Sequence, residues 1–137
     1  EAWLNDYPPA IRRAFGRDKS PRARAHGRAW ALVALAVLIA VHASLFHRLA
    51  LESPLSFQTA WAAAYVCFMT FNLVDLVVID LGVMLGLRPR WAVLPGTDPE
   101  HPAYRDPWHH VRAFAIGSVG GVAFAAIAAA IGWLALG

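Results

Sequence analysis

Three polar side chains, Asn72, Asp75 and Asp80, interrupt the long apolar run Ala63–Leu87. Side chains of these types can transfer protons, bind a cation or hold two helices together by hydrogen bonds. Because the run is long enough to cross most of a bilayer, an aspartate near its middle costs about 2.5–3.5 kcal/mol to insert. The three side chains must therefore face other protein, water or a bound cofactor rather than lipid.

The spacing of these residues separates the two carboxylates. On an α-helix, Asn72 and Asp75 are neighbours on one stripe, whereas Asp80 lies about 140° around from Asp75. The carboxylates should then have separate partners and should not share one proton or one ion. In a structural interpretation, Asp75 bonds to a neighbouring helix and Asp80 pairs with a cation near the membrane surface. Charge favours Arg112 as that cation, and helix face favours His110. The other interpretation is a proton-transfer or metal-binding role.

His42 is the one ionisable group deep inside the first apolar stretch. It either bonds to a neighbouring helix as a neutral imidazole or binds a pigment or metal. Ligation of haem by two histidines of one chain is disfavoured, because His42 lies roughly 20 Å from the surface at which His109 and His110 are placed. His42 is therefore the candidate cofactor-binding residue. The sequence itself requires no cofactor, and it predicts no catalytic residue and no metal site.

These residues belong to three apolar stretches in a chain of 137 residues that is 58% hydrophobic. Runs of this length and composition predict membrane-spanning helices. We expect an all-α integral membrane protein with three transmembrane helices and an N-terminal interfacial segment. The predicted single domain, 1–137, divides into a basic segment at 1–28, spans at 29–51, 54–87 and 108–136, and a loop at 88–107.

The last span carries small residues on one face. Gly117 and Gly121 form a G-x-x-x-G motif, and the same face continues through Ala125, Ala128 and Gly132. Small side chains let another backbone approach closely, so this face is predicted to pack against a helix. The pattern leaves open whether that helix belongs to this chain or to another subunit.

The basic residues are concentrated on one side of the predicted membrane. Seven of the twelve lie between Arg12 and Arg28, and the proline, glycine and charges of 17–28 predict an extended surface linker there. The positive-inside rule places this segment and the loop 88–107 in the cytoplasm and the C-terminus outside. A basic cluster beside a span indicates lipid headgroups rather than nucleic acid as its partner.

The run Asn72–Asp80, the stretch 89–97 (PRWAVLPGT) and the segment 103–114 (AYRDPWHHVRAF) resemble a group of uncharacterised bacterial multispanning membrane proteins. Those proteins carry an acidic N-x-x-D-x-x-x-x-D helix, a P-G-T loop after it and an aromatic segment with Tyr-Lys/Arg-Asp. The resemblance covers most of the chain. It implies a further helix upstream and no particular activity, and we expect the chain in the bacterial cytoplasmic (inner) membrane.

Three functional hypotheses from different classes remain. The favoured hypothesis is a small accessory subunit that packs against a larger membrane complex or against itself, because the small-residue face and the short turns are features of helix packing. The alternative is a cofactor- or ion-handling protein that uses His42, Asp75, Asp80 and His110. A transporter is a third hypothesis, although three helices must oligomerise to enclose a path. The expected partners are lipids together with other membrane subunits or further copies of the chain, and no motif calls for an enzyme.

Overall fold

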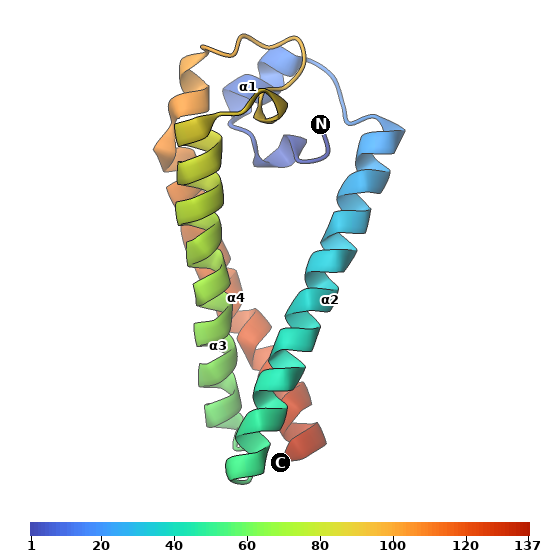
Figure 1. The fold of residues 1–137 in the computed structure, drawn as a ribbon, viewed down its shortest axis with the longest axis vertical. Helices are drawn as coiled ribbons and strands as arrows, with labels where there is room; N and C mark the ends of the chain where they lie inside the picture. The colour runs from blue at the N-terminus through green and yellow to red at the C-terminus, as the bar shows by residue number, and fades with distance from the viewer. The chain divides into compact units, whose positions relative to one another are not determined.

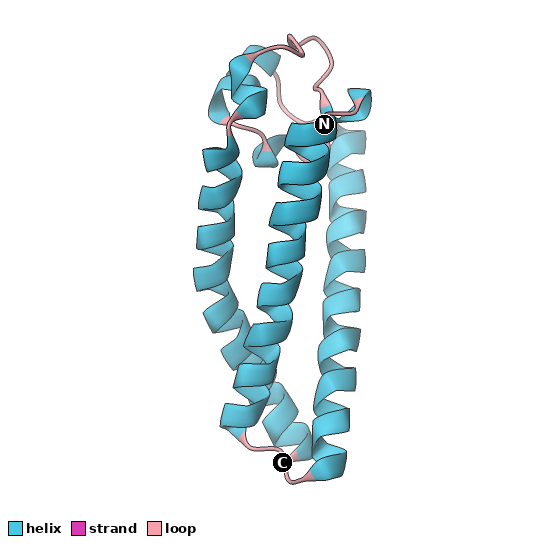
Figure 2. Ribbon diagram, turned by 60° about the vertical axis from the view of Figure 1, so that its left-hand side comes forward, coloured by secondary structure: helices cyan, strands magenta, loops and turns pink.

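A computed structural model describes residues 1–137, and it contains helices and loops but no strand (Figures 1 and 2). Each of three long helices is long and apolar enough to cross a membrane, so the predicted all-α fold with three transmembrane helices is confirmed. The long helices are α2 (Pro21–Glu52), the continuous helix of α3 (Phe57–Val74) and η2 (Asp75–Leu87), and α4 (Pro107–Leu136). Four short helices complete the chain: η1 (Leu4–Asp6), α1 (Pro9–Phe15), η3 (Arg90–Ala92) and η4 (Pro102–Arg105).

Helix α2 begins earlier than its predicted span at 29–51. The extended linker predicted at 17–28 is wrong, since α2 is helical from Pro21 onward. Ser20 explains the early start: its hydroxyl accepts a hydrogen bond from the backbone N–H of Ala23 at 3.1 Å, and proline suits the first helical position. The alanines and arginines that follow are strong helix formers, and they outweigh the single Gly27.

The second long helix changes its winding partway along. Residues 57–74 are α-helical, whereas η2 is a π-helix of 13 residues, in which backbone bonds join residues five apart. The last of these bonds runs from the N–H of Arg88 to the carbonyl of Val83 at 2.8 Å. Residues five apart in η2 are therefore separated by about one turn and lie on a similar side of the helix. In an α-helix they would point about 140° apart.

The chain, expected above as a single membrane domain, divides into two compact units. Unit 1 comprises Glu1–Leu32 and Asp75–Ala113, and unit 2 comprises Val33–Val74 and Phe114–Gly137. Each unit has its own buried cluster, and the units are described separately below.

Unit 1 is built around a small core between the N-terminal segment and the loop after η2. Its buried members are Leu4, Tyr7, Ile11, Phe15, Leu94 and Tyr104. Helix α1 contributes two of these side chains because Ile11 and Phe15 are four residues apart and share one face. Gly16 ends α1 in the left-handed conformation, with φ of 66°.

Unit 2 is a helix-packing core of small and aromatic residues. Its buried members are Phe46, Leu55, Ala60, Ala64, Ala125 and Ala129. Four of the six are alanines, which allow close approach between α3 and α4. The short connection between α2 and α3 contributes Leu55, which is 3% exposed.

Candidate functional site

His42 lies inside unit 2 between two backbone carbonyls. Its Nδ1 donates to the carbonyl of Leu38, one turn earlier on α2, at 2.7 Å. Its Nε2 lies 3.4 Å from the carbonyl of Ala64 on α3, and the ring makes edge contacts with Phe46 and Phe124. Neither ring nitrogen is free to bind a metal or pigment without giving up one of these contacts.

A groove of about 420 Å³ runs beside His42 between the unit 2 parts of α2 and α4. It is lined almost wholly by aliphatic and aromatic side chains, including Ile39, Phe124 and Ile131. Such a surface suits a hydrocarbon chain or another apolar group, and the only ionisable side chains in its lining are those of His42 and His47.

Asn72 holds α3 against α4. Its Nδ2 donates to the carbonyl of Phe114 at 3.2 Å and to the hydroxyl of Ser118 at 3.1 Å. The Ser118 hydroxyl in turn donates to the Phe114 carbonyl at 2.8 Å. The amide therefore completes a polar contact between two apolar helices, which is the role of many intramembrane polar residues.

The small-residue face of α4 meets other helices of the same chain. A Cβ atom at Gly117 would lie 3.0 Å from Oδ1 of Asn72, and one at Gly121 would lie 2.5 Å from Cδ1 of Phe68. A Cβ atom at Gly132 would collide with the ring of Phe46 on α2. Side chains of α2 and α3 thus occupy the space left open by these glycines.

The alanines of this face are unequal. Ala125 is fully buried, whereas Ala128 is only partly buried and packs at the edge of the unit 2 cluster. The fully buried neighbour is Ala129, which the spacing argument did not select. Toward the C-terminal end of α4, the packing stripe therefore follows positions 121, 125, 129 and 132.

In unit 1, Asp80 pairs with His110. The imidazole Nδ1 lies 3.0 Å from Oδ1 of Asp80, and both side chains are largely buried. Arg112, the other candidate partner, is exposed and forms no ion pair. Positions i and i+2 of an α-helix point about 200° apart. Because His110 faces Asp80 on η2, Arg112 faces away from η2.

Asp75 differs from the other intramembrane polar residues. It is the first residue of η2, it is exposed, and its carboxylate forms no hydrogen bond or ion pair within the chain. The π-helical winding places it about one turn from Asp80, on a similar side. The separation of about 140° expected from the sequence holds only for α-helical winding, which η2 does not have.

Within unit 1, the N-terminal segment is bonded to the start of α4 and to Lys19, which precedes α2. The ring of His109 donates from Nε2 to the carbonyl of Asp6 at 2.8 Å, and Nζ of Lys19 donates to the carbonyl of Ala2 at 2.7 Å. These bonds satisfy backbone carbonyls of residues that precede α1. They fix the N-terminal segment to the same end of the helices as the loop after η2.

Two tyrosines join the N-terminal segment to this loop. The hydroxyl of Tyr7 donates to the carbonyl of Ala92 at 2.7 Å, and that of Tyr104 accepts from the N–H of Leu94 at 3.0 Å and lies 2.7 Å from the hydroxyl of Thr97. The two rings meet edge to face at 6.1 Å. Burial, with the nearby Tyr104 adding to it, raises the pKa of Tyr7 to about 12.

This tyrosine network is not predicted from the sequence. The signals were present, because Tyr7 precedes two prolines that start α1, and Thr97 ends a Leu-Pro-Gly-Thr turn. Each signal indicates a local turn only. Neither signal reveals that residues more than eighty positions apart share a core.

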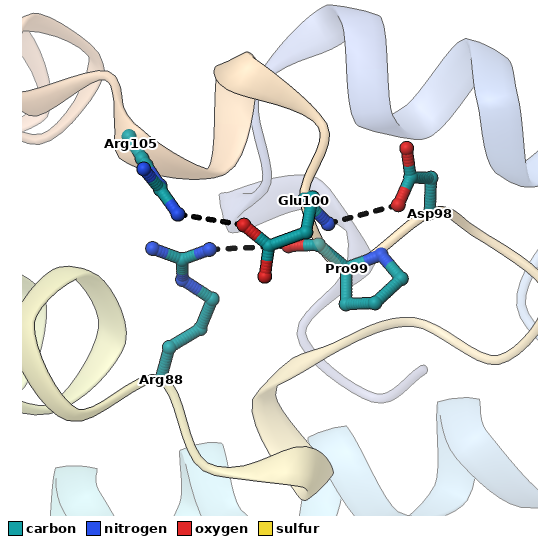
Figure 3. A network of polar contacts seen from close by, with 5 residues as sticks. All are labelled: Arg88, Asp98, Pro99, Glu100 and Arg105. Carbon is teal, nitrogen blue, oxygen red and sulfur yellow. Dashed lines mark hydrogen bonds and ion pairs between the residues drawn. The ribbon is translucent and has the colours of Figure 1, made fainter.

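A polar network closes the loop after η2 (Figure 3). Arg105 binds Glu100 with a 2.6 Å contact, Arg88 donates to the carbonyl of Pro99 at 3.1 Å, and the N–H of Glu100 donates to Asp98 at 2.9 Å. Arg88 has a φ of 40°, a left-handed conformation that is strained for any residue with a Cβ atom. This conformation ends η2 abruptly and turns the chain into the loop.

By fold and by composition, the protein is an all-α membrane protein with three spanning helices. Comparison with protein-family models, with curated proteins and with solved structures gives no match. Its function must therefore be argued from its own residues.

Proposed function

We propose that this chain is a small accessory subunit of the bacterial inner membrane, which acts by packing against a larger membrane complex or against itself. One observation carries the proposal: His42, Asn72 and Asp80 all bond to groups of their own chain. Side chains that were candidates for chemistry are used to hold helices together. A role in assembly accounts for them without a substrate.

The outer surface of the spans supports this proposal. Large apolar side chains are exposed along all three helices, among them Ile39 at 60%, Val119 at 75% and Leu134 at 79%. The apolar helices have lipid contact as their default environment, and the same surfaces can receive the helices of a partner. The membrane-spanning part of the chain thus offers more apolar surface than its own packing uses.

The proposed orientation rests on charge. Eleven of the twelve basic residues belong to unit 1, and Arg48 is the exception. The N-terminal segment and the loop after η2 share one core, so they lie on one side of the membrane. The positive-inside rule makes that side the cytoplasm. Membership of the bacterial group that has the N-x-x-D-x-x-x-x-D helix and P-G-T loop is proposed on those motifs alone.

Co-purification tests the accessory role. The full chain, tagged at its C-terminus, is expressed at native level, cross-linked in intact membranes and purified in mild detergent. We expect cross-linked species that contain companion membrane chains or further copies, identified by mass spectrometry. An unrelated three-span protein with the same tag is the control. Recovery of an uncross-linked single chain, with the control's background and nothing else, would refute the proposal.

Cofactor binding is a second candidate, and the apolar groove beside His42 is the observation that favours it. A flat apolar pigment would fit its lining, provided that His42 released the carbonyl of Ala64. The absorption spectrum of the protein purified from its native host tests this function. A visible band that His42→Ala abolishes, and that Ser44→Ala on the exposed side of α2 retains, would favour it over the accessory role.

A further inference from the structure

Asp75 is the intramembrane carboxylate that no group of the chain binds. It is exposed, and it forms no hydrogen bond or ion pair. It begins a helix of 13 residues that ends at Leu87, and the charged Arg88 follows directly. Asp75 therefore lies roughly 15 Å inside the span, which is near the middle of a hydrocarbon core about 30 Å thick. A lone charged carboxylate is costly at that depth, and its neutral form is favoured.

The charged neighbours of Asp75 come from three elements of unit 1. They are Asp80 on η2, Asp6 in η1 and His110 on α4, and Asp6 in turn has Lys19 and His109 near it. Two of the three neighbours are acids, and like charges repel, so they do not compensate a negative charge on Asp75. No group of three or more His, Cys, Asp and Glu side chains is arranged to hold a metal ion, which favours a proton as the ligand of this carboxyl group.

A series of proton-binding groups leads from Asp75 toward the end of the span. Because η2 is a π-helix, Asp80 lies on a similar side of it, roughly 5 Å along the axis from Asp75. Oδ1 of Asp80 lies 3.0 Å from Nδ1 of His110. The ring centroids of His110 and the half-buried His109 are 5.4 Å apart, a gap that one water molecule can bridge. An imidazole can accept a proton at one nitrogen and release one from the other, so these groups can carry a proton along the series.

We propose that Asp75 is a proton-binding site inside the membrane, which exchanges its proton with water by way of the Asp80–His110 pair. The carboxyl group of Asp75 is neutral when the site is filled. On release, the proton passes from Asp75 to the pair, and the pair releases one proton to water. The pair thus returns to its starting charge, and one proton leaves the chain for each negative charge formed on Asp75. This function is additional to the accessory role and does not depend on it.

A hydrophobic carbodiimide tests the site, because it adds to a carboxyl group that carries its proton. The full chain in liposomes is treated with dicyclohexylcarbodiimide at a series of pH values, and mass spectrometry identifies the labelled residue. We expect labelling of Asp75 at pH 7, where an aspartate in water, with a pKa of about 3.9, is almost wholly ionised. Asp98, which is exposed on the loop after η2, is the internal control and should stay unlabelled.

Two variants test the exchange with the Asp80–His110 pair. Asp80→Asn removes a neighbouring acid and should lower the pH of half-maximal labelling by roughly one unit or more, whereas Asp98→Asn should leave it unchanged. His110→Gln keeps a hydrogen-bond donor but cannot pass on a proton. After a jump to high pH, it should slow the loss of the infrared band of the protonated Asp75 by about tenfold or more, whereas the exposed His26→Gln should not.

Four results would overturn the proposal. An unlabelled Asp75 at pH 7, in a chain that keeps its helical circular dichroism, would reject the site. An unchanged pH of half-maximal labelling in Asp80→Asn, or an unchanged rate in His110→Gln, would reject the exchange path. Protection of Asp75 by sodium ions at constant pH would reject the proton as the ligand. The accessory role is tested separately by co-purification, so the two proposals fail separately.

Discussion

Replacing Gly121 with alanine should destabilise the protein, whereas the same replacement at the adjacent Gly120 should not. A Cβ atom at Gly121 would lie 2.5 Å from Cδ1 and 2.6 Å from Cε1 of Phe68. The ring of Phe68 has little room to retreat, because it packs on Phe124 at a centroid distance of 5.3 Å. A Cβ atom at Gly120 would meet no atom within 4 Å.

The pair of variants isolates the cost of crowding. Both replacements remove a helical glycine, which is worth about 1 kcal/mol in favour of alanine at either site. Only the alanine at Gly121 forces a methyl group into a filled space, at a cost of about 1–3 kcal/mol. The difference in free energy of unfolding between the two variants should therefore be about 1–3 kcal/mol. Leucine at Gly121 should cost more, and leucine at Ile116, which is 67% exposed, should cost little.

Equilibrium unfolding in mixed micelles measures this difference. The full chain in dodecyl maltoside is titrated with sodium dodecyl sulfate, and tryptophan fluorescence follows the separation of the helices. Equal free energies of unfolding for the two alanine variants would show that Phe68 does not pack on Gly121. A less stable Gly120→Ala would place the packing face of α4 on its other side.

Three further predictions concern the contact between Asp80 and His110, the burial of Tyr7, and the orientation in the membrane. Asp80→Ala should lower the free energy of unfolding by about 1.5–3 kcal/mol, as loss of a charged hydrogen bond does. Arg112→Gln should leave it unchanged in micelles that hold one copy of the chain. Equal losses in the two variants would contradict the pairing of Asp80 with His110. Tyr7 has a pKa of about 12 when folded against 10.0 when exposed, so the folded state holds its proton between these values and stability should fall as pH rises from 10 to 12. The loss in free energy of unfolding reaches about 2–3 kcal/mol by pH 12, and it should be absent in Tyr7→Phe. The same dependence of unfolding on pH in both proteins would refute this prediction. In a cysteine-free background, a cysteine at Thr97 should resist impermeant thiol reagents in intact cells and one added after Gly137 should react, and the reverse labelling would invert the orientation.

Much of the fold follows from hydropathy, because three runs of apolar residues leave few alternatives in a chain of this length. The charged residues and Gly27 suggest a linker before α2, but Ser20-Pro21 is a strong helix-start signal, and the helix begins there. The predicted span at 54–87 begins three residues before the observed start of α3 at Phe57. Hydropathy thus locates helices well and their ends less well.

The candidate site was only partly predictable. Small residues on α4 predicted a packing face, and the polar residues predicted contacts between helices, but the partner of each contact depends on helix winding. The π-helical η2 changes which residues share a side, and no residue pattern in Asp75–Leu87 indicates that winding. The contacts of Tyr7 with Ala92 depend on chain segments brought together only by the complete fold.

The core of unit 1 also sets an order of events during synthesis. Ile11 and Leu94 touch the same buried cluster, yet about 80 residues of chain separate them, which a ribosome adds in roughly 4–16 s. During that interval α2 and the helix of α3 and η2 enter the membrane, while Ile11 and Phe15 of α1 lack the partners that later bury them. The apolar side chains of α1 are then open to chaperones and proteases, and they become buried only after Leu94 and Tyr104 have been added.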